Sequence, residues 1–541
     1  MGFLQTHRSI KLSAIVVVVI GLICLVVITP IVRHEKNEKH HGGNYNEAAK
    51  GYSSANEINS KTELISTLMT ASSSSSTSSA SSSTNASTKS SSTSSTSSTS
   101  TTSSKTSSTA TATPTPVSPW IDPDTPKQFT TKFIGGQNFT LVFSDEFEKA
   151  GRTFAEGDDP KWTAVDLWYW ATGDLEWYSP KAVSTSDGSM KIRMTKEEIN
   201  GHSYMSGMVQ SWNKFCFTGG IIEVNVSLPG SSEIPGFWPG IWTMGNLGRA
   251  GYGATTDGTW PYSYDTCDAA VAVNQSMPMN HNLGNQCSLQ PGQRLNKCVC
   301  PGEDHPNPGV GRGAPEIDIL EASVDPSTKL GTASMSDQLA PFNFNPANNQ
   351  RNVDQQYVEI YNKEETHLGW TGGPLQQCVS GVASIPPDAY EGRGFQTYSF
   401  EYVPGAEGYI IWRINDVDIW KMDAKAIGPD PLSKTAQRLV SEEPMSIIMN
   451  FGMSASWVWG FESDLEKLPF PSTMSIDYVR VYQLPDKINV SCDPPNFPTA
   501  QYIKDHPKAY NSPTARTWKE AGYEFPKYSL EPTCFAKDVT N

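Results

Sequence analysis

The chain has 541 residues, a formal net charge of −15 at pH 7 and 37% hydrophobic residues. This length accommodates two or three average domains, or one large β-rich domain with extensions, and the hydrophobic content is sufficient for a folded core. The acidic balance argues against a nucleic-acid partner, because phosphate binding depends on clustered Lys and Arg. The 15 Trp and 20 Tyr give the chain many flat side chains.

The first predicted element is a transmembrane helix at residues 12–32, a run without any charged residue. At ~1.5 Å per residue the helix is ~31 Å long, about the thickness of a bilayer core. Residues 1–11 then form a cytoplasmic tail. A cleaved signal peptide is the alternative, but its apolar region is normally ~7–15 residues long and ends at a small-residue cleavage site, which "VITPIVRHEK" lacks.

The orientation of this helix follows from residues beyond it. Basic residues flank the run on both sides, so the positive-inside rule does not favour a cytoplasmic N-terminus. Eight of the nine Cys follow the run, and this even number predicts disulfides in an oxidising compartment, with the pairing left open. Five N-x-S/T glycosylation sequons also follow, at Asn85, Asn138, Asn225, Asn274 and Asn489. We therefore expect a single-pass type II membrane glycoprotein of the secretory pathway, with its large part luminal or extracellular.

Residues 33–118 are predicted to be a disordered stalk. From Ser72 to about Thr115 the sequence is almost entirely Ser and Thr, a composition that cannot bury a core. A Ser/Thr-rich tract that ends in Pro residues is typical of an O-glycosylated stalk, and a bare linker is the alternative.

Residues 119–490 are predicted to form an all-β, two-sheet sandwich. Short segments with period-2 alternation recur along this region, separated by Gly, Pro and Asn. They cover residues 139–144, 189–195, 220–228, 315–323, 398–403, 408–414, 445–451 and 474–484. Residues 261–313, with four Cys, interrupt the pattern as an insertion that we expect to border one end of a cleft. Residues 491–541 form a C-terminal extension, which a Cys492–Cys534 disulfide would tie down.

The segment "EIDILE" places three acids, Glu316, Asp318 and Glu321, among apolar residues. Strand alternation puts Glu316 and Asp318 on one face, and a β-bulge at Ile319-Leu320 would bring Glu321 to the same face. Paired carboxyl groups of this kind serve retaining glycosidases, in which one carboxylate attacks the anomeric carbon and the other carries a proton. A solvated acidic face and a metal site are the alternatives. The ten positions on either side of these acids contain no His, which argues against a transition-metal site and leaves a structural Ca²⁺ site open.

"EIDILE" also resembles the E-x-D-x-x-E motif of glycoside hydrolase family 16, and "LVFSDEFE", "YMSGMVQS", "FWPGIWTM" and "MSIDYVRVYQ" resemble other strands of that family. The resemblance covers roughly residues 135–485. It implies a β-jelly roll, with Glu316 as nucleophile, Asp318 as assisting acid and Glu321 as general acid/base. One departure is that the Trp260-Pro261 pair, which lies just before the first catalytic Glu in laminarinases of the family, is separated from Glu316 by the insertion.

The sugar-binding residues expected in the cleft are Trp238, Trp242 and Trp177, since flat rings cover the apolar faces of pyranoses. The segment at 248–268, with the anchor, the stalk and the Cys-bearing tail, resembles the fungal β-glucan-synthesis-associated membrane proteins. The resemblance implies a membrane-anchored retaining glucosidase or transglycosidase that acts on cell-wall β-glucan, in β-1,6-glucan biosynthesis or remodelling, without a cofactor. A non-catalytic glucan-binding scaffold that supports glucan synthesis is the alternative.

Overall fold

The computed structural model describes residues 118–272, 291–342, 344–345, 350–351, 353–371, 376–431, 435–458 and 461–530. All of them belong to the second of two compact units, residues 110–541. The predicted transmembrane helix at 12–32, the stalk up to residue 117, Asn85, Asn274 and Cys534 lie outside the described residues. Within the described ranges, the longest apolar helices fall short of the length needed to cross a bilayer.

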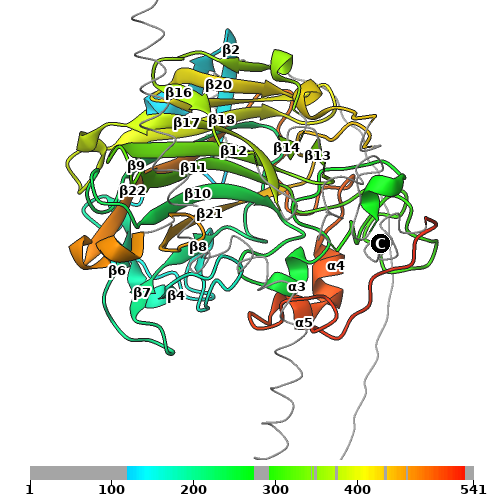
Figure 1. Ribbon diagram of the computed structural model, residues 1–541, viewed down its shortest axis with the longest axis horizontal. Coiled ribbons are helices and arrows are strands. Elements are labelled where there is room, and N and C mark those ends of the chain that lie inside the picture. Colours follow the sequence, from blue (N-terminus) through cyan, green and yellow to red (C-terminus); the bar gives the residue numbers. More distant parts are fainter. Residues whose placement is uncertain are drawn as a thin grey trace, which may run out of the picture. The chain divides into compact units, whose positions relative to one another are not determined.

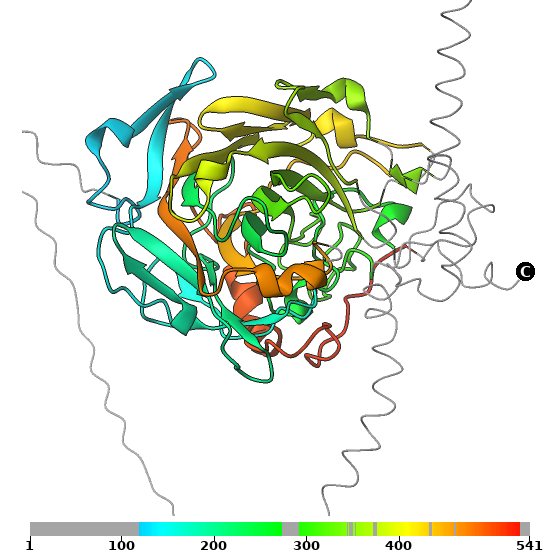
Figure 2. The ribbon, with the colours of Figure 1, turned by 60° about the vertical axis from the view of Figure 1, so that its left-hand side comes forward.

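The described part is an all-β sandwich, as predicted (Figure 1). One sheet has ten strands, in the order β1 (Thr131–Ile134), β2 (Gln137–Asp145), β22 (Ser472–Gln483), β9 (Gly220–Ser227), β18 (Gln396–Val403), β19 (Tyr409–Ile414), β20 (Val417–Asp423) and β15 (Val358–Ile360), with β6 (Ser189–Met194) paired to β22 and β5 (Val183–Ser186) paired to β6. The hairpin of β1 and β2, in blue and cyan, projects from the sandwich in Figure 2.

The other sheet has eight strands and carries the acidic segment. Its order is β16 (Thr366–Leu368), β17 (Gln377–Ile385), β12 (Gly331–Leu339), β11 (Glu316–Val324), β10 (Trp238–Gly245), β21 (Met445–Gly452), β8 (Met208–Gln210) and β3 (Thr163–Ala164). Two small pairs complete the strands: β4 (Glu176–Tyr178) with β7 (Tyr204–Ser206), and β13 (Phe344–Asn345) with β14 (Gln350–Arg351).

The helices are short. The α-helices are α3 (Gly253–Thr256), α4 (Ala500–Asp505) and α5 (Pro507–Tyr510). The 3₁₀-helices are η2 (Lys127–Phe129), η3 (Pro180–Ala182), η4 (Ala269–Val271), η5 (Gln355–Tyr357), η6 (Pro387–Ala389), η7 (Ala424–Ile427) and η8 (Phe461–Lys467).

The main core lies between the two sheets, where the inward side chains of both meet. The rings of Trp412 and Trp420 stack with their centroids 4.0 Å apart, and both residues are fully buried. Gly381 leaves room for this pair, because a Cβ there would lie 2.5 Å from the Trp420 ring. The Trp412 indole donates a hydrogen bond of 2.8 Å to the backbone oxygen of Asp318, which ties the ten-stranded sheet to the acidic strand.

All eight predicted strand segments are strands in the structure. The sequence analysis missed β12 and β17, which lie beside β11 in the same sheet. In β12 the buried residues Ala333 and Met335 alternate with Ser334 and Ser336, so the strand has a polar face, but its small residues also suit a loop.

The insertion and the C-terminal extension pack together into a second apolar cluster. Its members include Leu247, Ala254, Leu295, Tyr502 and Trp518. Figure 1 accordingly shows α3 beside α4 and α5.

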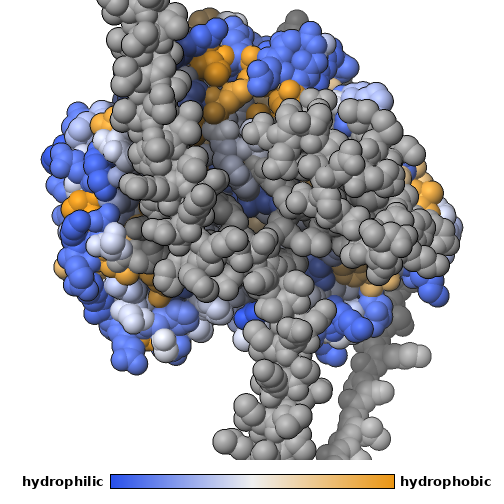
Figure 3. Space-filling model, viewed as in Figure 1, coloured by the Kyte–Doolittle hydropathy of each residue, from blue (hydrophilic) through white to orange (hydrophobic). Residues whose placement is uncertain are grey.

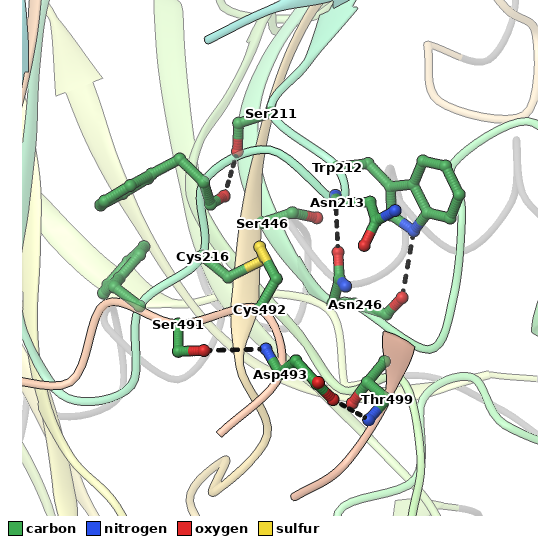
Figure 4. Close-up of a disulfide and its surroundings, with 12 residues drawn as sticks. Ser211, Trp212, Asn213, Cys216, Asn246, Ser446, Ser491, Cys492, Asp493 and Thr499 are labelled. Carbon is green, nitrogen blue, oxygen red and sulfur yellow. Dashed lines mark hydrogen bonds between the residues drawn. A yellow bond between two sulfur atoms is a disulfide. The ribbon is translucent and has the colours of Figure 1, made fainter. Parts of the chain in front are cut away.

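The expected Cys492–Cys534 disulfide is wrong. Cys492 forms a disulfide with Cys216, with their Cα atoms 4.8 Å apart (Figure 4). The first residues of the extension pass beside the chain that leads into β9, so the extension is linked covalently to the sandwich at its start. A second disulfide joins Cys267 to Cys298 within the insertion.

Candidate active site

The β11 strand carries a β-bulge at the position predicted from the sequence. On its β12 side Asp318 pairs with Ser336 and Glu321 with Ser334, so Ile319 and Leu320 together face one residue. On its β10 side Glu316 and Glu321 pair with Met244 and Gly240, which are four residues apart. An even separation places the two Glu side chains on the same face, ~13 Å apart along the strand at their backbones.

The apolar residues of β11 explain why the strand tolerates three acids. Ile317, Ile319 and Leu320 are fully buried in the core between the sheets. Because side chains alternate and the bulge adds one residue, the acids occupy the opposite face. There Asp318 is buried, whereas Glu316 and Glu321 are half-buried.

Each carboxyl group is held by a different element. The Trp260 indole nitrogen donates to Oε2 of Glu316 at 2.7 Å, and the Trp238 indole nitrogen donates to Oε1 of Glu321 at 3.2 Å. Asp318 accepts hydrogen bonds at Oδ2 from the hydroxyl of Ser336 and the amide of Gln338, both on β12. The carboxyl groups therefore have uncharged donors as partners, and none of these hydrogen bonds supplies a positive charge.

This environment raises the pKa values of all three acids. Burial raises the pKa of Asp318 to about 6, although the Ser336 and Gln338 hydrogen bonds lower it. Burial, followed by the charges of Asp318 and Glu321, raises the pKa of Glu316 well above its usual value. Burial and the Asp318 charge do the same to the pKa of Glu321. A hydrogen bond between the two side chains raises the pKa of Glu316 and lowers the pKa of Asp318, which favours the proton on Glu316.

Trp242 lies on the same face, since it pairs with Asp318 across β10 and β11. Its indole nitrogen donates to Oδ1 of Asn450 at 2.8 Å, and the Asn450 amide donates to the Tyr178 hydroxyl at 3.1 Å. Tyr178 in turn donates to Asp174 at 3.0 Å. Trp242 is 7% exposed, so it forms part of the floor and presents little open surface to a sugar.

Trp238 and Trp177 have different surroundings. The half-buried Trp238 ring stacks on the ring of Trp457, with centroids 5.0 Å apart and planes 8° apart. The Trp177 indole donates to Asp166 at 2.6 Å. Glu176 and Tyr178, its neighbours on β4, face Gly452, so Trp177 points the other way, and the structure does not bring it together with the carboxyl groups. A sugar-binding role for these three Trp residues stays a prediction.

Several residues of the site were missed by the sequence analysis: Trp260, Ser336, Gln338, Asn450 and Tyr169. The pKa of Tyr169 is raised, which keeps its hydroxyl neutral. The largest cause is burial, followed by the charges of Glu316, Asp174, Asp318 and Glu321. The Trp260-Pro261 pair was a usable signal, because folding returns Trp260 to Glu316 despite the insertion between them. The polar residues of β12 carried no comparable signal.

The insertion has both ends at the site. It begins after Trp260, and Ala314 near its other end packs in one cluster with Trp242 and Met244. Its described body packs against the C-terminal extension, as in the contact of Arg294 with Trp518. Whether the insertion narrows a sugar path stays a prediction.

The sequons within the described ranges differ in accessibility. Asn138 on β2 is exposed, whereas Asn225 on β9 and Asn489 are half-buried. The Asn225 amide donates to Asp477 at 2.9 Å. On the face seen in Figure 3 hydrophilic residues predominate among the coloured atoms, in keeping with a solvent-exposed surface. Glycosylation stays a prediction at all five positions.

No group of three or more His, Cys, Asp or Glu side chains in the described ranges is arranged to hold a metal ion. The structural Ca²⁺ site left open by the sequence therefore gains no support from this part of the chain.

This protein is therefore an all-β sandwich that carries three carboxyl groups on one face of a bulged strand. The chain belongs to the family of beta-glucan synthesis-associated proteins, SKN1/KRE6/Sbg1, which it matches over residues 83–534. It is 47% identical to beta-glucan synthesis-associated protein KRE6 of Saccharomyces cerevisiae over 423 residues, which are 76% of this chain and 56% of that protein. It is also 47% identical to SKN1 of Candida albicans over 419 residues, 76% of this chain and 54% of that protein. The chain thus spans about half the length of the curated relatives it matches.

Among solved structures, the chain is similar to the E144S mutant of SCLam, a non-specific endo-beta-1,3(4)-glucanase from family GH16. The sequence identity is 17%, the match covers 65% of this chain and 98% of that chain, and the TM-score is 0.38.

Proposed function

We propose that this protein is a retaining glycosidase or transglycosidase that acts on cell-wall β-glucan. The observation that carries the proposal is the bulge in β11, which puts Glu316, Asp318 and Glu321 on one face of the sheet. Retention needs two carboxyl groups with unlike roles, one ionised and one protonated. Burial among uncharged donors raises the pKa values of the carboxyl groups in such a cluster, which favours a protonated group beside an ionised one.

Glu316 is proposed as the nucleophile and Glu321 as the general acid/base. The indole hydrogen bond to Glu316 is 2.7 Å long and the one to Glu321 is 3.2 Å long, so this contribution alone favours the ionised form more at Glu316. It acts against burial and the charges of Asp318 and Glu321, which raise the pKa of Glu316. Asp318 can take up the proton that it shares with Glu316, which frees the Glu316 carboxylate to attack the anomeric carbon. Glu321 protonates the leaving oxygen and then removes a proton from the incoming hydroxyl.

The incoming hydroxyl decides the outcome, since water gives hydrolysis and a sugar gives a new glycosidic bond. We infer transfer, because the stacked rings of Trp238 and Trp457 lie beside the Glu321 carboxyl group and would shield it from water. The names of the relatives, which state an association with β-glucan synthesis, agree with bond formation. They also favour a second candidate, a glucan-binding scaffold without catalysis.

We also propose that the protein is a type II membrane protein of the secretory pathway, anchored by residues 12–32. The uncharged run, the sequons and the two disulfides support this location. Digestion of the native protein with endoglycosidases should increase its gel mobility. A protein that carries no glycan and is fully reduced in cells would contradict the orientation.

The catalytic proposal is tested with the purified full-length chain, one labelled β-1,3- or β-1,6-oligoglucoside and an unlabelled acceptor. Wild-type protein should yield longer labelled products, and Glu316→Gln should abolish them while thermal unfolding stays cooperative. Glu364→Gln, a change at an exposed Glu, is the matched control and should retain activity. If wild-type protein binds glucan but yields neither longer nor shorter products, the scaffold function is correct instead.

A further inference from the structure

Trp260, the residue that donates to Glu316, ends a compact turn that starts with α3. Its backbone N–H donates to the oxygen of Thr256 at 3.0 Å. Its neighbour Thr259 is fully buried and accepts a hydrogen bond of 2.8 Å from the backbone of Ala314, two residues before Glu316. The position of the Trp260 indole is therefore set by residues 253–260 as a unit.

This unit lies against the C-terminal extension, whose described residues 491–530 we call the C-terminal strap. The backbone N–H of Trp518 donates to Oδ2 of Asp257 at 2.8 Å. The Ala254 N–H donates to the oxygen of Ala515 at 3.0 Å. The two chains approach so closely that a Cβ at Gly253 would lie 2.9 Å from the backbone oxygen of Arg516.

Arg294 of the insertion joins the strap to the same unit. Its backbone N–H donates to the oxygen of Gly258 at 2.6 Å, and its guanidinium donates to the oxygen of Asp257 at 3.0 Å. The guanidinium also lies 3.6 Å from the centroid of the Trp518 ring and bonds the Tyr502 hydroxyl. This Arg is fully buried, so removal of its aromatic partners would leave a charge without its packing.

The strap itself is anchored away from α3. Figure 4 shows its first residues, where Cys492 is bonded to Cys216 and Asp493 accepts a hydrogen bond of 2.7 Å from the Thr499 backbone. The Arg312 guanidinium donates a hydrogen bond of 3.1 Å to the Thr499 hydroxyl and forms a buried ion pair with Glu443 at 2.8 Å. Strap residues before α4 are therefore fixed to the sandwich independently of their contact with residues 253–260.

We propose that the C-terminal strap is a positioning element of the candidate active site, which holds residues 253–260 so that the Trp260 indole stays against Glu316. The inference rests on the proposed function for its catalytic meaning. The hydrogen-bond donors to Glu316, Asp318 and Glu321 described above, Trp260, Trp238, Ser336 and Gln338, all lie outside the strap, so the strap acts through Trp260. Loss of the strap contact should therefore change the ionisation of Glu316, whereas a merely stabilising strap would change only the melting temperature.

The experiment follows the Glu316 carboxyl in the full-length chain by NMR with ¹³C-carboxyl-labelled Glu, with Glu316→Gln to assign the signal. Trp260→Phe removes a hydrogen bond that favours the ionised form, so the Glu316 midpoint should rise by roughly one pH unit. The other ionisable groups that face Glu316 are Asp318 and Glu321 on its own strand and Tyr169 on the loop before β4. They are unchanged in every variant.

Trp518→Ala should raise the midpoint in the same direction, and Trp518→Ala with Trp260→Phe should raise it no further than Trp260→Phe alone. Trp518→Phe should keep the midpoint at its wild-type value, because it retains an aromatic ring at this position. It loses no hydrogen bond, since the Trp518 indole nitrogen is buried without a partner among the described residues. Gly253→Ala, whose methyl group would lie 2.9 Å from the Arg516 oxygen of the strap and 2.5 Å from the Trp170 ring, provides a second variant if Trp518→Ala does not fold. Trp162→Ala, at a fully buried Trp of the core between the sheets, is the control for destabilisation alone.

An unchanged midpoint in both Trp518→Ala and Gly253→Ala would overturn the proposal, as would shifts that add to that of Trp260→Phe. The titration is readable in a protein without activity, so it separates this inference from the proposed function. If the protein is active, Trp518→Ala should lower kcat about tenfold and leave KM within about twofold, because the strap acts on Glu316 and not on the sugar.

Discussion

The indole nitrogen of Trp238 lies 3.2 Å from Oε1 of Glu321, although 83 residues separate them in the chain. The two strands that carry them are neighbours in the eight-stranded sheet, and Trp238 is two residues from Gly240, the register partner of Glu321. A neutral donor at this carboxyl group lowers its pKa, against the burial that raises it.

Trp238→Phe should therefore raise the pKa of Glu321 further. If Glu321 is the general acid, the basic limb of the pH–activity profile moves to higher pH, because the limb reports loss of its proton. The shift should be on the order of one pH unit. Trp457→Phe is the control, since its indole donates to the backbone oxygen of Ala322 at 3.4 Å and should leave the limb in place. A basic limb that does not move in Trp238→Phe would contradict the role of Glu321.

The buried Asp318 should make the protein less stable as the pH rises. Its pKa is about 6 in the folded protein and near the usual 3.8 when unfolded, so between these values the folded state binds more protons. Stability then falls as pH rises through this window, and the loss is complete above it. Asp318→Asn should flatten the pH dependence of the melting temperature between about pH 4 and 6. An equally steep dependence in the variant would show that other groups cause it.

The Cys216–Cys492 disulfide should contribute to stability in the oxidised protein. It closes a loop with a sequence separation of 276, so its loss enlarges the unfolded ensemble. Cys492→Ala should lower the free energy of unfolding by about 2–5 kcal/mol, measured by thermal or denaturant unfolding without reductant. Cys300→Ala is the control, because Cys300 forms no disulfide with a described residue. Equal losses in the two variants would argue against a stabilising crosslink.

Gly381 should be sensitive to the addition of a single methyl group. A Cβ there would lie 2.5 Å from the ring of Trp420, which is stacked on Trp412 and cannot move without disturbing it. Gly381→Ala should cost about 1–3 kcal/mol of unfolding free energy. Adding Trp420→Phe makes room for the methyl group, so the double variant should lose less than the sum of the single changes. Additive losses would place the strain elsewhere.

The acidic strand and its bulge were predicted because the necessary information is local. Period-2 alternation puts Ile317 and Ile319 in the core and the acids on the other face, and the five-residue spacing from Glu316 to Glu321 requires one extra residue. The partners of these acids could not be predicted in the same way. Ser336 and Gln338 reach Asp318 only because β12 pairs with β11 in one particular register.

The disulfide partner of Cys492 illustrates the same limit. With eight Cys after residue 32, sequence alone leaves many pairings, and Cys534 was the expected partner as the other Cys of the C-terminal extension. The observed partner, Cys216, precedes Cys492 by 276 positions and meets it because the extension starts beside the strand that follows Cys216.

By itself the sequence determined the all-β class, the strand that carries Glu316, Asp318 and Glu321, and the place of its bulge. Alternation and spacing act over a few residues, where the backbone leaves little choice. Only the tertiary structure decided that Trp260 and Trp238 hold the two Glu carboxyl groups, and that the C-terminal strap lies behind residues 253–260. These contacts join residues far apart in the chain, and they exist only when sheet packing and burial have brought distant segments together.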